Sequence, residues 1–421
     1  MRNEPDYVWP RSDFTRIPFG IYHDADVYTQ EQHRVFRGPT WSYLCFDVEI
    51  PNPGDFKCVY VGDTPVVVNR DQDGSLHAFI NRCAHRGSTV RREEFGNAKD
   101  HTCVYHQWCY SLKGELMGVP FRRGVKGKGG MPKDFQIADH GLHTLRVESF
   151  NGVIFASFSD EAPPLEDFLD EPICRHLKRL THKPVKILGY QRQYIHGNWK
   201  LYTDNTRDPN HGGLLHPFQV TFGIARLTHG GGAVLDKRGC HNISMVEGDS
   251  DSEEDASKAY EDSGSGAYMS DYRLNDASML ATQKEYGDEI TLSIMSIFPN
   301  VVFQQIGNSL ATRQIRCKNV DEFELYWTYY GYEDDDEAMT AHRLRQANMA
   351  GPGGLISMED GEAIEIVHRA IKRETDQHSV AEYGGRGKIE TQDTLITEVP
   401  LRGFWAYYCE LMGIEANGAA A

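Results

Sequence analysis

Two short segments of this 421-residue chain each place a histidine close behind a cysteine. The first reads Cys83-Ala-His85, the second reads Cys103-Val-Tyr-His106, and 17 residues lie between them. Strand-like runs and turn signals surround both segments, which predicts two loops that each present one thiolate and one imidazole toward a common centre. Four side chains that must meet in space constrain the fold of this region more than any other feature of the sequence.

These four side chains match the ligands of a Rieske-type [2Fe–2S] cluster. In such a cluster two imidazoles replace two thiolates on one of the irons, which raises the reduction potential. A zinc site is an alternative, because it also takes two cysteines and two histidines. Zinc fingers usually place both cysteines before both histidines, so the alternating order here favours the cluster. Unrelated loop residues at coincidental spacing are the remaining alternative.

A second group of candidate metal ligands lies in residues 198–216, NWKLYTDNTRDPNHGGLLH. Asp208 and His211 are three residues apart and share one face of a predicted helix. His211 and His216 diverge by about 140° on an ideal helix, so they bind one ion only if the helix ends or distorts between them, as Gly212-Gly213 permits. Two histidines and a carboxylate form the facial triad of non-haem Fe(II) oxygenases, which leaves positions open for dioxygen and substrate.

The third ligand of this triad is distant in the sequence. Asp360, at the predicted start of an amphipathic helix, is the candidate, and spacing alone also admits Glu359 or Glu362. A one-electron carrier earlier in the chain needs an acceptor, and an open iron site would serve as one.

Each of these residues also has a structural alternative. Asp208 precedes Pro209, as the N-cap of a helix does. Asp360 follows Ser357 by three residues, which is close to a capping box. His216 suits a buried position with satisfied hydrogen bonds.

The pattern of strands and helices predicts an α+β chain in three parts. Residues 1–40 are expected to pack on the third part, 41–160 to form a small antiparallel β domain with the cluster, and 161–421 to form a larger domain around an antiparallel sheet. The acidic, Ser/Gly-rich residues 247–267 are expected to form a mobile surface loop. The main expected strands are 57–61, 65–69, 76–80, 152–158, 289–296, 300–306 and 323–331, and the expected helices are 166–181, 196–206, 338–350 and 358–374.

Charge and hydropathy narrow the possible partners. The formal net charge of −17 disfavours nucleic acid and anionic membranes, because phosphate binding needs a basic face. The first 14 residues lack the apolar core of a signal peptide, and no apolar run approaches the ~18 residues of a membrane span. The nine scattered cysteines do not suggest a disulfide framework. We therefore expect a cytoplasmic protein.

These motifs resemble those of the α subunits of Rieske non-haem iron aromatic-ring-hydroxylating oxygenases. The resemblance covers nearly the whole chain, from RIPFG at 16–20 to GPGGLISMED at 351–360 and LRGFW at 401–405. Within this family the sequence is similar to enzymes that act on aromatic carboxylates, namely the large subunits of terephthalate 1,2-dioxygenase, anthranilate dioxygenase and salicylate 5-hydroxylase.

The resemblance implies a fold, cofactors and partners. The fold is an antiparallel β Rieske domain plus a helix-grip catalytic domain around a curved sheet. Asp208 matches the acidic residue that links the two metal centres of neighbouring subunits, and Asn205 is a second candidate catalytic residue. The implied assembly is a homotrimer or an α₃β₃ complex with a small β subunit, supplied by an NADH-dependent reductase, directly or through a ferredoxin. The implied ligands are Cys83, His85, Cys103 and His106 for the Rieske [2Fe–2S] cluster, and His211, His216 and Asp360 for the mononuclear Fe(II).

Three positions depart from the family pattern. Asp204-Asn205 stands where Glu-Asn is usual, Asn210 where Tyr is usual, and Gly212-Gly213 where a pair such as Ala-Ser is common. None of these changes removes a metal ligand, so we expect them to affect the shape of the pocket.

Arginines are the candidates for holding a carboxylated substrate, because a guanidinium stays charged and contacts a carboxylate through two hydrogen bonds. We select Arg313 and Arg402, with an ordinary ion-pair role as the alternative. The expected reaction is the conversion of an aromatic carboxylate and O₂ to a cis-dihydrodiol. Terephthalate is the favoured substrate, because the sequence of residues 290–299 is similar to that of terephthalate enzymes. The alternatives are a monohydroxylase such as salicylate 5-hydroxylase, an anthranilate dioxygenase, and a non-catalytic Rieske electron carrier.

Overall fold

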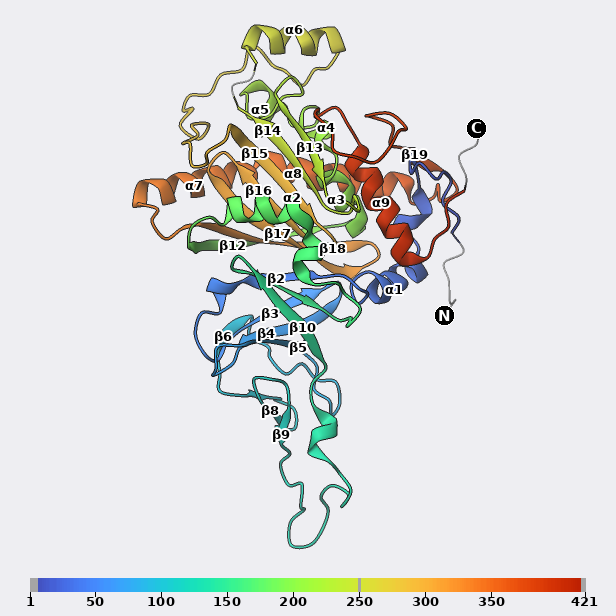
Figure 1. Cartoon of the computed structure of the whole chain (residues 1–421), viewed down its shortest axis with the longest axis vertical. Coiled ribbons are helices and arrows are strands. Elements are labelled where there is room, and N and C mark those ends of the chain that lie inside the picture. The colour runs from blue at the N-terminus through green and yellow to red at the C-terminus, as the bar shows by residue number, and fades with distance from the viewer. Residues whose placement is uncertain (1–6, 249–250, 418–421) are drawn as a thin grey trace. The chain divides into compact units, whose positions relative to one another are not determined.

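The computed structural model describes residues 7–248 and 251–417, which form two compact units (Figure 1). The smaller unit is Phe36–Phe168, and the larger unit contains the residues on both sides of it. The boundaries predicted at 41 and 160 differ from these by five and eight residues. Along the part of the chain that the structure describes, no helix is both long and apolar enough to cross a membrane.

The smaller unit consists mainly of antiparallel strands, as predicted. Seven strands form a sheet in the order β2-β11-β10-β5-β4-β3-β6, and three short strands form a second sheet, β7-β8-β9. Val66, Val67 and Val68 of the internal strand β4 are fully buried, since β-branched side chains pack well on a pleated surface. The elements are β2 (Ser42–Phe46), η2 (Asp47–Glu49), β3 (Asp55–Val61), β4 (Thr64–Arg70), β5 (Leu76–Ile80), β6 (Phe95–Asn97), β7 (His101–Thr102), β8 (Cys109–Tyr110), β9 (Leu116–Gly118), η3 (Ile137–His140), β10 (Thr144–Phe150) and β11 (Val153–Ser157).

The larger unit is built on a second seven-stranded antiparallel sheet. Its strand order is β12-β18-β17-β16-β15-β14-β13. β16, β17 and β18 are buried along most of their length, so the polar side chains that they carry lie inside the unit. The strands are β12 (Val185–Ile195), β13 (Gly231–Leu235), β14 (Asn242–Glu247), β15 (Ile290–Ile297), β16 (Val301–Ile306), β17 (Ser309–Asn319) and β18 (Glu322–Tyr332).

Helices pack on this sheet and carry the candidate iron ligands. α3 contacts β15, α8 contacts β12, and the two helices contact each other. The four predicted helices are confirmed within a few residues by α2, α3, α7 and α8, although α2 is broken at Asp170, whose φ is +68°. The helices are α2 (Leu165–Leu180), α3 (Trp199–Thr206), α4 (Pro209–Gly212), α5 (Pro217–Thr221), α6 (Glu253–Ser263), α7 (Glu337–Ala350), α8 (Leu355–Ile371) and α9 (Val399–Met412).

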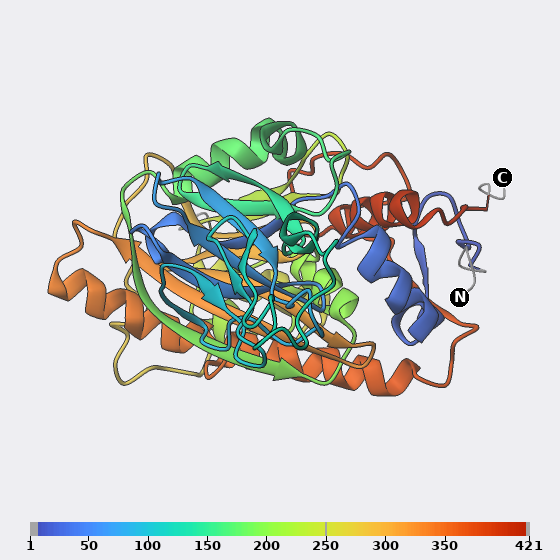
Figure 2. The same ribbon diagram turned by 90° about the horizontal axis from the view of Figure 1, so that it is seen from below.

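The N-terminal segment belongs to the larger unit as far as Val35. It contains β1 (Arg16–Pro18), η1 (Phe19–Tyr22) and α1 (Ala25–Arg34). β1 pairs with β19 (His378–Val380), and α1 lies beside α9 (Figures 1 and 2). The buried carboxylate of Glu31 in α1 accepts hydrogen bonds from Trp199 Nε1 (2.8 Å) and Lys200 Nζ (2.6 Å), which hold the start of α3.

The acidic segment differs from the mobile loop that its composition predicts. Residues 249–250 lie outside the described residues, but α6 follows almost at once. Ser252 caps this helix by accepting a hydrogen bond from the N–H of Asp255, and Gly264 ends it with a φ of +73°. The first turn contains three carboxylates, which interact favourably with the positive end of the helix dipole. The same acidic residues that indicated a loop therefore favour a helix start.

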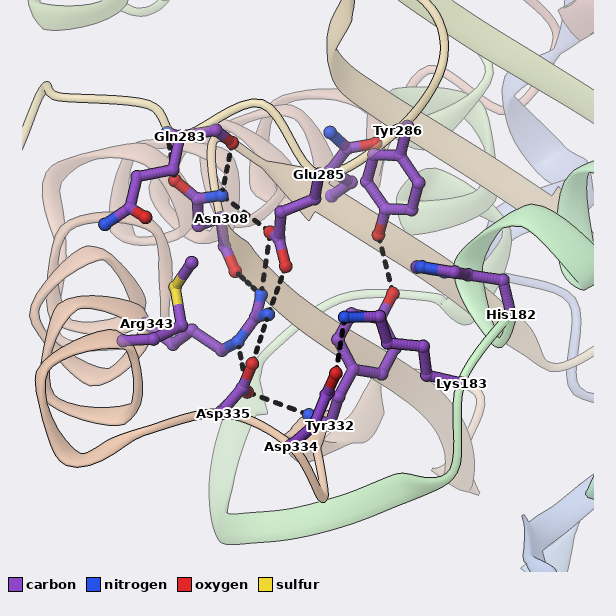
Figure 3. Close-up of polar contacts among 12 residues, drawn as sticks. His182, Lys183, Gln283, Glu285, Tyr286, Asn308, Tyr332, Asp334, Asp335 and Arg343 are labelled. Carbon is purple, nitrogen blue, oxygen red and sulfur yellow. Dashed lines mark hydrogen bonds and ion pairs between the residues drawn. The ribbon is translucent and has the colours of Figure 1, made fainter.

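A buried polar network fixes the chain between α6 and β15 to the end of the sheet (Figure 3). Arg343 of α7 donates to Asp335 (2.7 and 3.0 Å), to Glu285 and to the carbonyl of Asn308 (2.6 Å). Asn308 in turn donates to the carbonyl of Gln283 (2.8 Å) and to Glu285 (2.6 Å). Because Arg343 is almost completely buried, the carboxylates of Glu285 and Asp335 are needed to stabilise its positive charge.

Candidate active site

The two cysteine–histidine segments adopt the same backbone arrangement in the smaller unit. In each loop the cysteine N–H donates to the carbonyl five residues ahead, Ser88 or Trp108, at 2.8 Å. In each loop the residue four positions ahead also donates back to the cysteine carbonyl, at 2.9 Å from Gly87 and 2.8 Å from Gln107. That residue has a positive φ in both loops, +74° at Gly87 and +57° at Gln107. Two matching loops therefore present the four candidate ligands.

The loops bring the two cysteines and the two histidines together. Cys83 and Cys103 are buried in the same core cluster. The rings of His85 and His106 lie edge to face, with centroids 4.5 Å apart, and the ring of His85 stacks on Trp108 at 4.7 Å. The predicted loop positions between β5 and β8 are thus confirmed.

These groups fit an iron–sulfur cluster. Nδ1 of His85 is buried and has no hydrogen-bond partner, although a buried imidazole nitrogen normally finds one. The Tyr110 hydroxyl accepts a hydrogen bond from the N–H of Ala84 (3.1 Å) and lies 3.1 Å from Sγ of Cys83. A hydroxyl in this place can donate to a thiolate, and hydrogen bonds to the cluster sulfurs adjust the reduction potential.

The predicted facial triad is assembled in the larger unit. Nε2 of His211 and Nε2 of His216 lie 3.4 and 3.2 Å from the same oxygen, Oδ1 of Asp360. One ligand atom from each residue falls within 4.8 Å of the others. Two neutral imidazoles and one carboxylate at this separation can hold a divalent iron and leave coordination positions open.

A helix break between the two histidines makes this convergence possible. α4 ends at Gly212 with Gly213 as its C-cap, and α5 starts after His216. Gly213 is also tightly enclosed, because a Cβ there would lie 2.4 Å from Cγ of Leu227. A larger residue here would have to displace the side chain of Leu227.

Asp360 is held by a neighbouring amide rather than used as a cap. α8 starts at Leu355 after Gly354, so Asp360 lies inside the helix, and both its predicted place at the start and the capping box with Ser357 are wrong. Nδ2 of Asn205 donates to Oδ1 of Asp360 at 3.0 Å. Asn205, a candidate catalytic residue in the sequence, thus contacts the triad directly.

The two alternative carboxylates have other positions. Oε2 of Glu359 lies 2.7 Å from Nδ1 of His216, on the side of the ring away from Asp360. Glu362 is exposed on α8. The geometry therefore places Asp360 with the two histidines and makes Glu359 a partner of His216.

Asp208 is the N-cap of α4, as its structural alternative proposed. Its Oδ1 accepts hydrogen bonds from the N–H groups of Asn210 (2.9 Å) and His211 (3.2 Å), and its backbone carbonyl contacts Nδ1 of His211. A cap in this position still leaves Oδ2 of Asp208 beside His211, at 4.0 Å from Nδ1. The capping role and a role beside the iron ligand are therefore compatible.

Asp204 lies next to this site and is partly buried. Its carboxyl group contacts the Tyr22 hydroxyl and accepts a hydrogen bond from Nε1 of Trp405 at 3.0 Å. Burial raises the pKa of Asp204 to about 7 despite these two hydrogen bonds. The shorter Asp in place of the usual Glu is thus enclosed by aromatic residues of η1 and α9.

A cavity extends from the triad into the larger unit. Its wall is mainly apolar beyond the metal ligands, which suits an aromatic ring. The apolar lining residues are Ala225, Leu227, Val246, Leu292, Ile294, Ile306, Ile356 and Leu395.

Arg313 of β17 lines this cavity. Its Nη1 donates to the Tyr202 hydroxyl at 3.1 Å, Nη2 donates to Oε1 of Gln304, and its guanidinium carbon lies 4.6 Å from the ring centroid of Trp327. Nε is buried without a hydrogen-bond partner. Arg226 also lines the cavity, but it is paired with Asp251 at 3.2 Å.

Arg402 does not line the cavity, contrary to the substrate-binding role expected from the sequence. It lies on α9, where Nη1 donates to the backbone carbonyls of Gly387 (3.0 Å) and Asp13 (3.4 Å). Its side chain is completely buried among these segments. The arginine therefore joins the N-terminal segment to the C-terminal part of the unit.

Several contacts of the site could not be predicted from the sequence. These contacts join residues that are distant in the sequence or have no informative spacing. They are the pair Glu359 and His216, the pair Tyr110 and Cys83, and the contacts of Arg313 with Tyr202 and Gln304. The spacing of residues along the chain does not predict such pairs. The one available signal is that Glu359 directly precedes the ligand candidate Asp360 in the sequence.

Comparisons with known proteins agree with this geometry. The Rieske [2Fe-2S] domain model matches residues 40–128, and the model of the ring hydroxylating alpha subunit (catalytic domain) matches residues 175–413. The anthranilate 1,2-dioxygenase large subunit of Burkholderia cepacia is 47% identical over 97% of this chain and 96% of its own length. The alpha 2 subunit of the terephthalate 1,2-dioxygenase terminal oxygenase component of Comamonas sp. is 44% identical over 97% and 98%, respectively.

Two further comparisons support the same conclusion. The large oxygenase component of salicylate 5-hydroxylase from Ralstonia sp. is 41% identical over 97% of both chains. The crystal structure of naphthalene 1,2-dioxygenase from Rhodococcus sp. matches with a TM-score of 0.78 at 23% identity, covering 95% of both chains, which shows the same fold. This chain belongs to the family of Rieske aromatic-ring-hydroxylating dioxygenase α subunits, whose cofactors are a Rieske [2Fe–2S] cluster and a mononuclear non-haem iron.

Proposed function

We propose that this chain is the α subunit of the terminal oxygenase component of an aromatic-carboxylate dioxygenase, which converts the aromatic ring to a cis-dihydrodiol with O₂, two protons and two electrons supplied by a reductase. The observation that carries the proposal is Arg313. The residue is only 3% exposed and lines the cavity that contains the triad. The hydrogen-bond partners of its guanidinium among the described residues, Tyr202 and Gln304, are neutral.

The buried positive charge of Arg313, whose hydrogen-bond partners are neutral, would be stabilised by an anion. Burying a charge without a counter-charge is unfavourable, and a substrate carboxylate would supply that counter-charge at Arg313. A carboxylate can also accept two parallel hydrogen bonds from a guanidinium, which fixes the direction of the ring attached to it. The apolar wall of the cavity would then hold the ring while the carboxylate stays at Arg313.

The remaining residues have positioning roles in this proposal. His211, His216 and Asp360 hold the iron, and the two cysteine–histidine loops hold the cluster. When bound, the iron supplies the centre at which dioxygen is reduced and the cluster supplies it with single electrons. Asn205 and Glu359 orient Asp360 and His216, and the apolar wall limits the access of water.

The proposed assembly has several components. The names of the relatives describe large subunits or components of oxygenase systems, which supports a small β subunit and an NADH-dependent reductase, with or without a ferredoxin. We include a trimer of α subunits, alone or as α₃β₃, in which Asp208 connects the cluster of one subunit to the iron of the next.

A product analysis tests the reaction. The reconstituted oxygenase with a compatible reductase is given benzoate, anthranilate, terephthalate and salicylate under ¹⁸O₂. Two labelled oxygens in the product of one of these acids support the dioxygenase, with terephthalate favoured. One labelled oxygen supports the second candidate, a monohydroxylase, which the similarity to salicylate 5-hydroxylase favours. Two irons per chain instead of three would contradict both and leave a Rieske electron carrier.

Substitution of Arg313 tests the substrate class. We expect Arg313→Gln to lower kcat/KM for the accepted carboxylate by about 10- to 100-fold, since it removes hydrogen bonds to a charged group. Arg313→Lys should recover part of this loss, because it keeps the charge but not the paired hydrogen bonds. The matched control is the primary amide of the same substrate, whose low turnover should not depend on Arg313. An unchanged kcat/KM for the acid, at full iron content, would contradict the proposal.

A further inference from the structure

Three side chains from distant parts of the larger unit meet at a place that is separate from the iron triad. His23 follows η1, Asp321 lies in the turn between β17 and β18, and His368 lies near the end of α8. One possible ligand atom from each residue lies within 4.8 Å of the other two. Oδ1 of Asp321 is 2.9 Å from Nε2 of His368 and 3.7 Å from Nδ1 of His23.

The two histidines have buried nitrogens with no hydrogen-bond partner. Both ring nitrogens of His23 are in this state, including Nδ1, which faces Asp321. In His368 the unpaired nitrogen is Nδ1, whereas Nε2 contacts Asp321. The side chains of His23 and His368 are only 7% and 5% exposed. The two rings lie with their centroids 4.2 Å apart. Buried polar atoms are normally paired, and the exceptions often mark a binding site for a group such as an ion.

The three side chains are also in the protonation states that bind metals. Burial lowers the pKa of His23 to about 4 and also lowers that of His368, so both imidazoles are neutral near pH 7. Burial alone would raise the pKa of Asp321, but hydrogen bonds from Lys372 and His368 outweigh it and lower the pKa. Neutral imidazole and ionised carboxylate are the forms that ligate a metal.

We propose that His23, Asp321 and His368 form a further metal site, in addition to those of the cluster and the mononuclear iron, for Zn²⁺ or a similar divalent transition-metal ion. Ligands at 2.0–2.2 Å from a tetrahedral zinc are separated from each other by roughly 3.4 Å, and the distances of 2.9 and 3.7 Å lie on either side of this value. The side chain of Asp321 is 42% exposed, which gives the ion a route from solvent and leaves the fourth position to water.

Lys372 weakens metal binding at this site and determines which oxygen of Asp321 is available to the ion. Its Nζ lies 3.1 Å from Oδ2 of Asp321, so this oxygen is occupied and Oδ1 remains for the ion. The ammonium group repels a cation, which limits the affinity of the site. Removal of this charge should therefore strengthen metal binding.

The position of the site gives it a structural effect on the active site. His368 and the iron-ligand candidate Asp360 lie on the same helix, about two turns apart. A metal bound at His23 would join the N-terminal segment and the β17–β18 turn to this helix. The ion would thus stabilise the element that carries Asp360 without contacting the substrate.

The test measures zinc in the protein with its iron sites already filled. The intact oxygenase is dialysed against a limiting Zn²⁺ solution, and zinc and iron are both counted by elemental analysis. We expect about one zinc per chain with no loss of iron, and a rise in Tm with zinc. His23→Gln and His368→Gln should each lower the zinc affinity at least tenfold and remove the rise in Tm, while the control His33→Gln, at an exposed position of α1, should change neither.

Lys372→Gln and diffraction provide independent measurements. Lys372→Gln should increase the zinc affinity several-fold, because it removes a neighbouring positive charge. If the histidine variants do not fold, anomalous diffraction at the zinc edge from the unmodified protein decides the matter, with a peak expected between His23, Asp321 and His368. Zinc found only where it has displaced iron, or equal zinc affinity in His23→Gln and the unmodified protein, would overturn the proposal.

Discussion

His216 and Glu359 are joined by a hydrogen bond of 2.7 Å between Nδ1 of the imidazole and Oε2 of the carboxylate. The other nitrogen of the same ring, Nε2, lies 3.2 Å from Asp360. A carboxylate on one nitrogen fixes the tautomer and the direction of a histidine that binds a metal through the other. Glu359 therefore prepares His216 for iron without being a ligand.

We predict that Glu359→Ala lowers the iron affinity of the mononuclear site by about 10- to 100-fold, which is the usual effect of removing such a partner. Iron content after dialysis against a chelator measures this change. The control is Glu362→Ala on the exposed side of the same helix, which should keep its iron. If Glu362→Ala lost iron and Glu359→Ala did not, the assignment of the two carboxylates would be reversed.

Asp208→Asn should separate capping from electron transfer. Asparagine is as good an N-cap as aspartate, so α4 should keep its start and both iron centres should stay filled. Loss of the charge should slow the oxidation of the reduced cluster in a single turnover by roughly tenfold or more, the equivalent of about 1.5 kcal/mol. Stopped-flow absorbance of the cluster measures this rate. An unchanged rate at full metal content would remove Asp208 from the proposed path between subunits.

Asp204 should make the protein less stable as the pH rises. The pKa is about 7 in the folded chain and close to 3.8 in the unfolded chain, so between these values the folded state holds a proton that the unfolded state has released. The contribution of Asp204 to the free energy of unfolding should therefore fall by roughly 2 to 3 kcal/mol between pH 5 and pH 8.

Urea unfolding at the two pH values, with equal iron content, measures this effect. Asp204→Asn keeps the shape of the side chain but cannot ionise, so the difference in stability between it and the unmodified protein should change by this amount. The control Asp376→Asn, at an exposed position, should give a constant difference. A constant difference for Asp204→Asn as well would contradict the raised pKa.

Arg343→Met should lower the free energy of unfolding by about 3–5 kcal/mol, because it leaves Glu285 and Asp335 buried without their counter-charge. Thermal or urea unfolding measures this loss. Arg345→Met, an exposed position on the same helix with a single hydrogen bond to Ser278, should change stability by less than about 1 kcal/mol. Similar losses in the two variants would mean that helix α7, rather than the network in Figure 3, determines the effect.

Local sequence patterns predicted the fold class and half of the strands in the two larger sheets. Helices α3, α7 and α8 follow from hydrophobic periodicity, and so do the strands β3, β4, β5, β11, β15, β16 and β18. The other strands of these sheets were not predicted, among them the long strands β12 and β17. The break between His211 and His216 follows from helix geometry and Gly212-Gly213. The acidic segment was predicted wrongly as a loop because its composition suits both disorder and a helix start, and the cap at Ser252 favours the helix. The start of α8 was also predicted too late, since Gly354 rather than Ser357 precedes the helix.

The candidate site was predictable where its residues are close together in the sequence. The two cysteine–histidine segments and the His211–His216 segment are local motifs, and their spacing is informative. Arg313 and Arg402 looked alike as candidates, and only the packing of β17 and α9 separates them. One faces a cavity and the other binds backbone carbonyls, which is a difference that no spacing along the chain records.

The matching loops of the smaller unit have a consequence for the speed of electron exchange. Each loop closes on its own backbone through two hydrogen bonds. The Tyr110 hydroxyl and the Trp108 ring also contact the first loop, at Ala84 and His85. A ligand cage held in this way would change shape little when a bound cluster gains or loses an electron. The reorganisation energy would then be small, which would favour rapid electron transfer at a modest difference in potential.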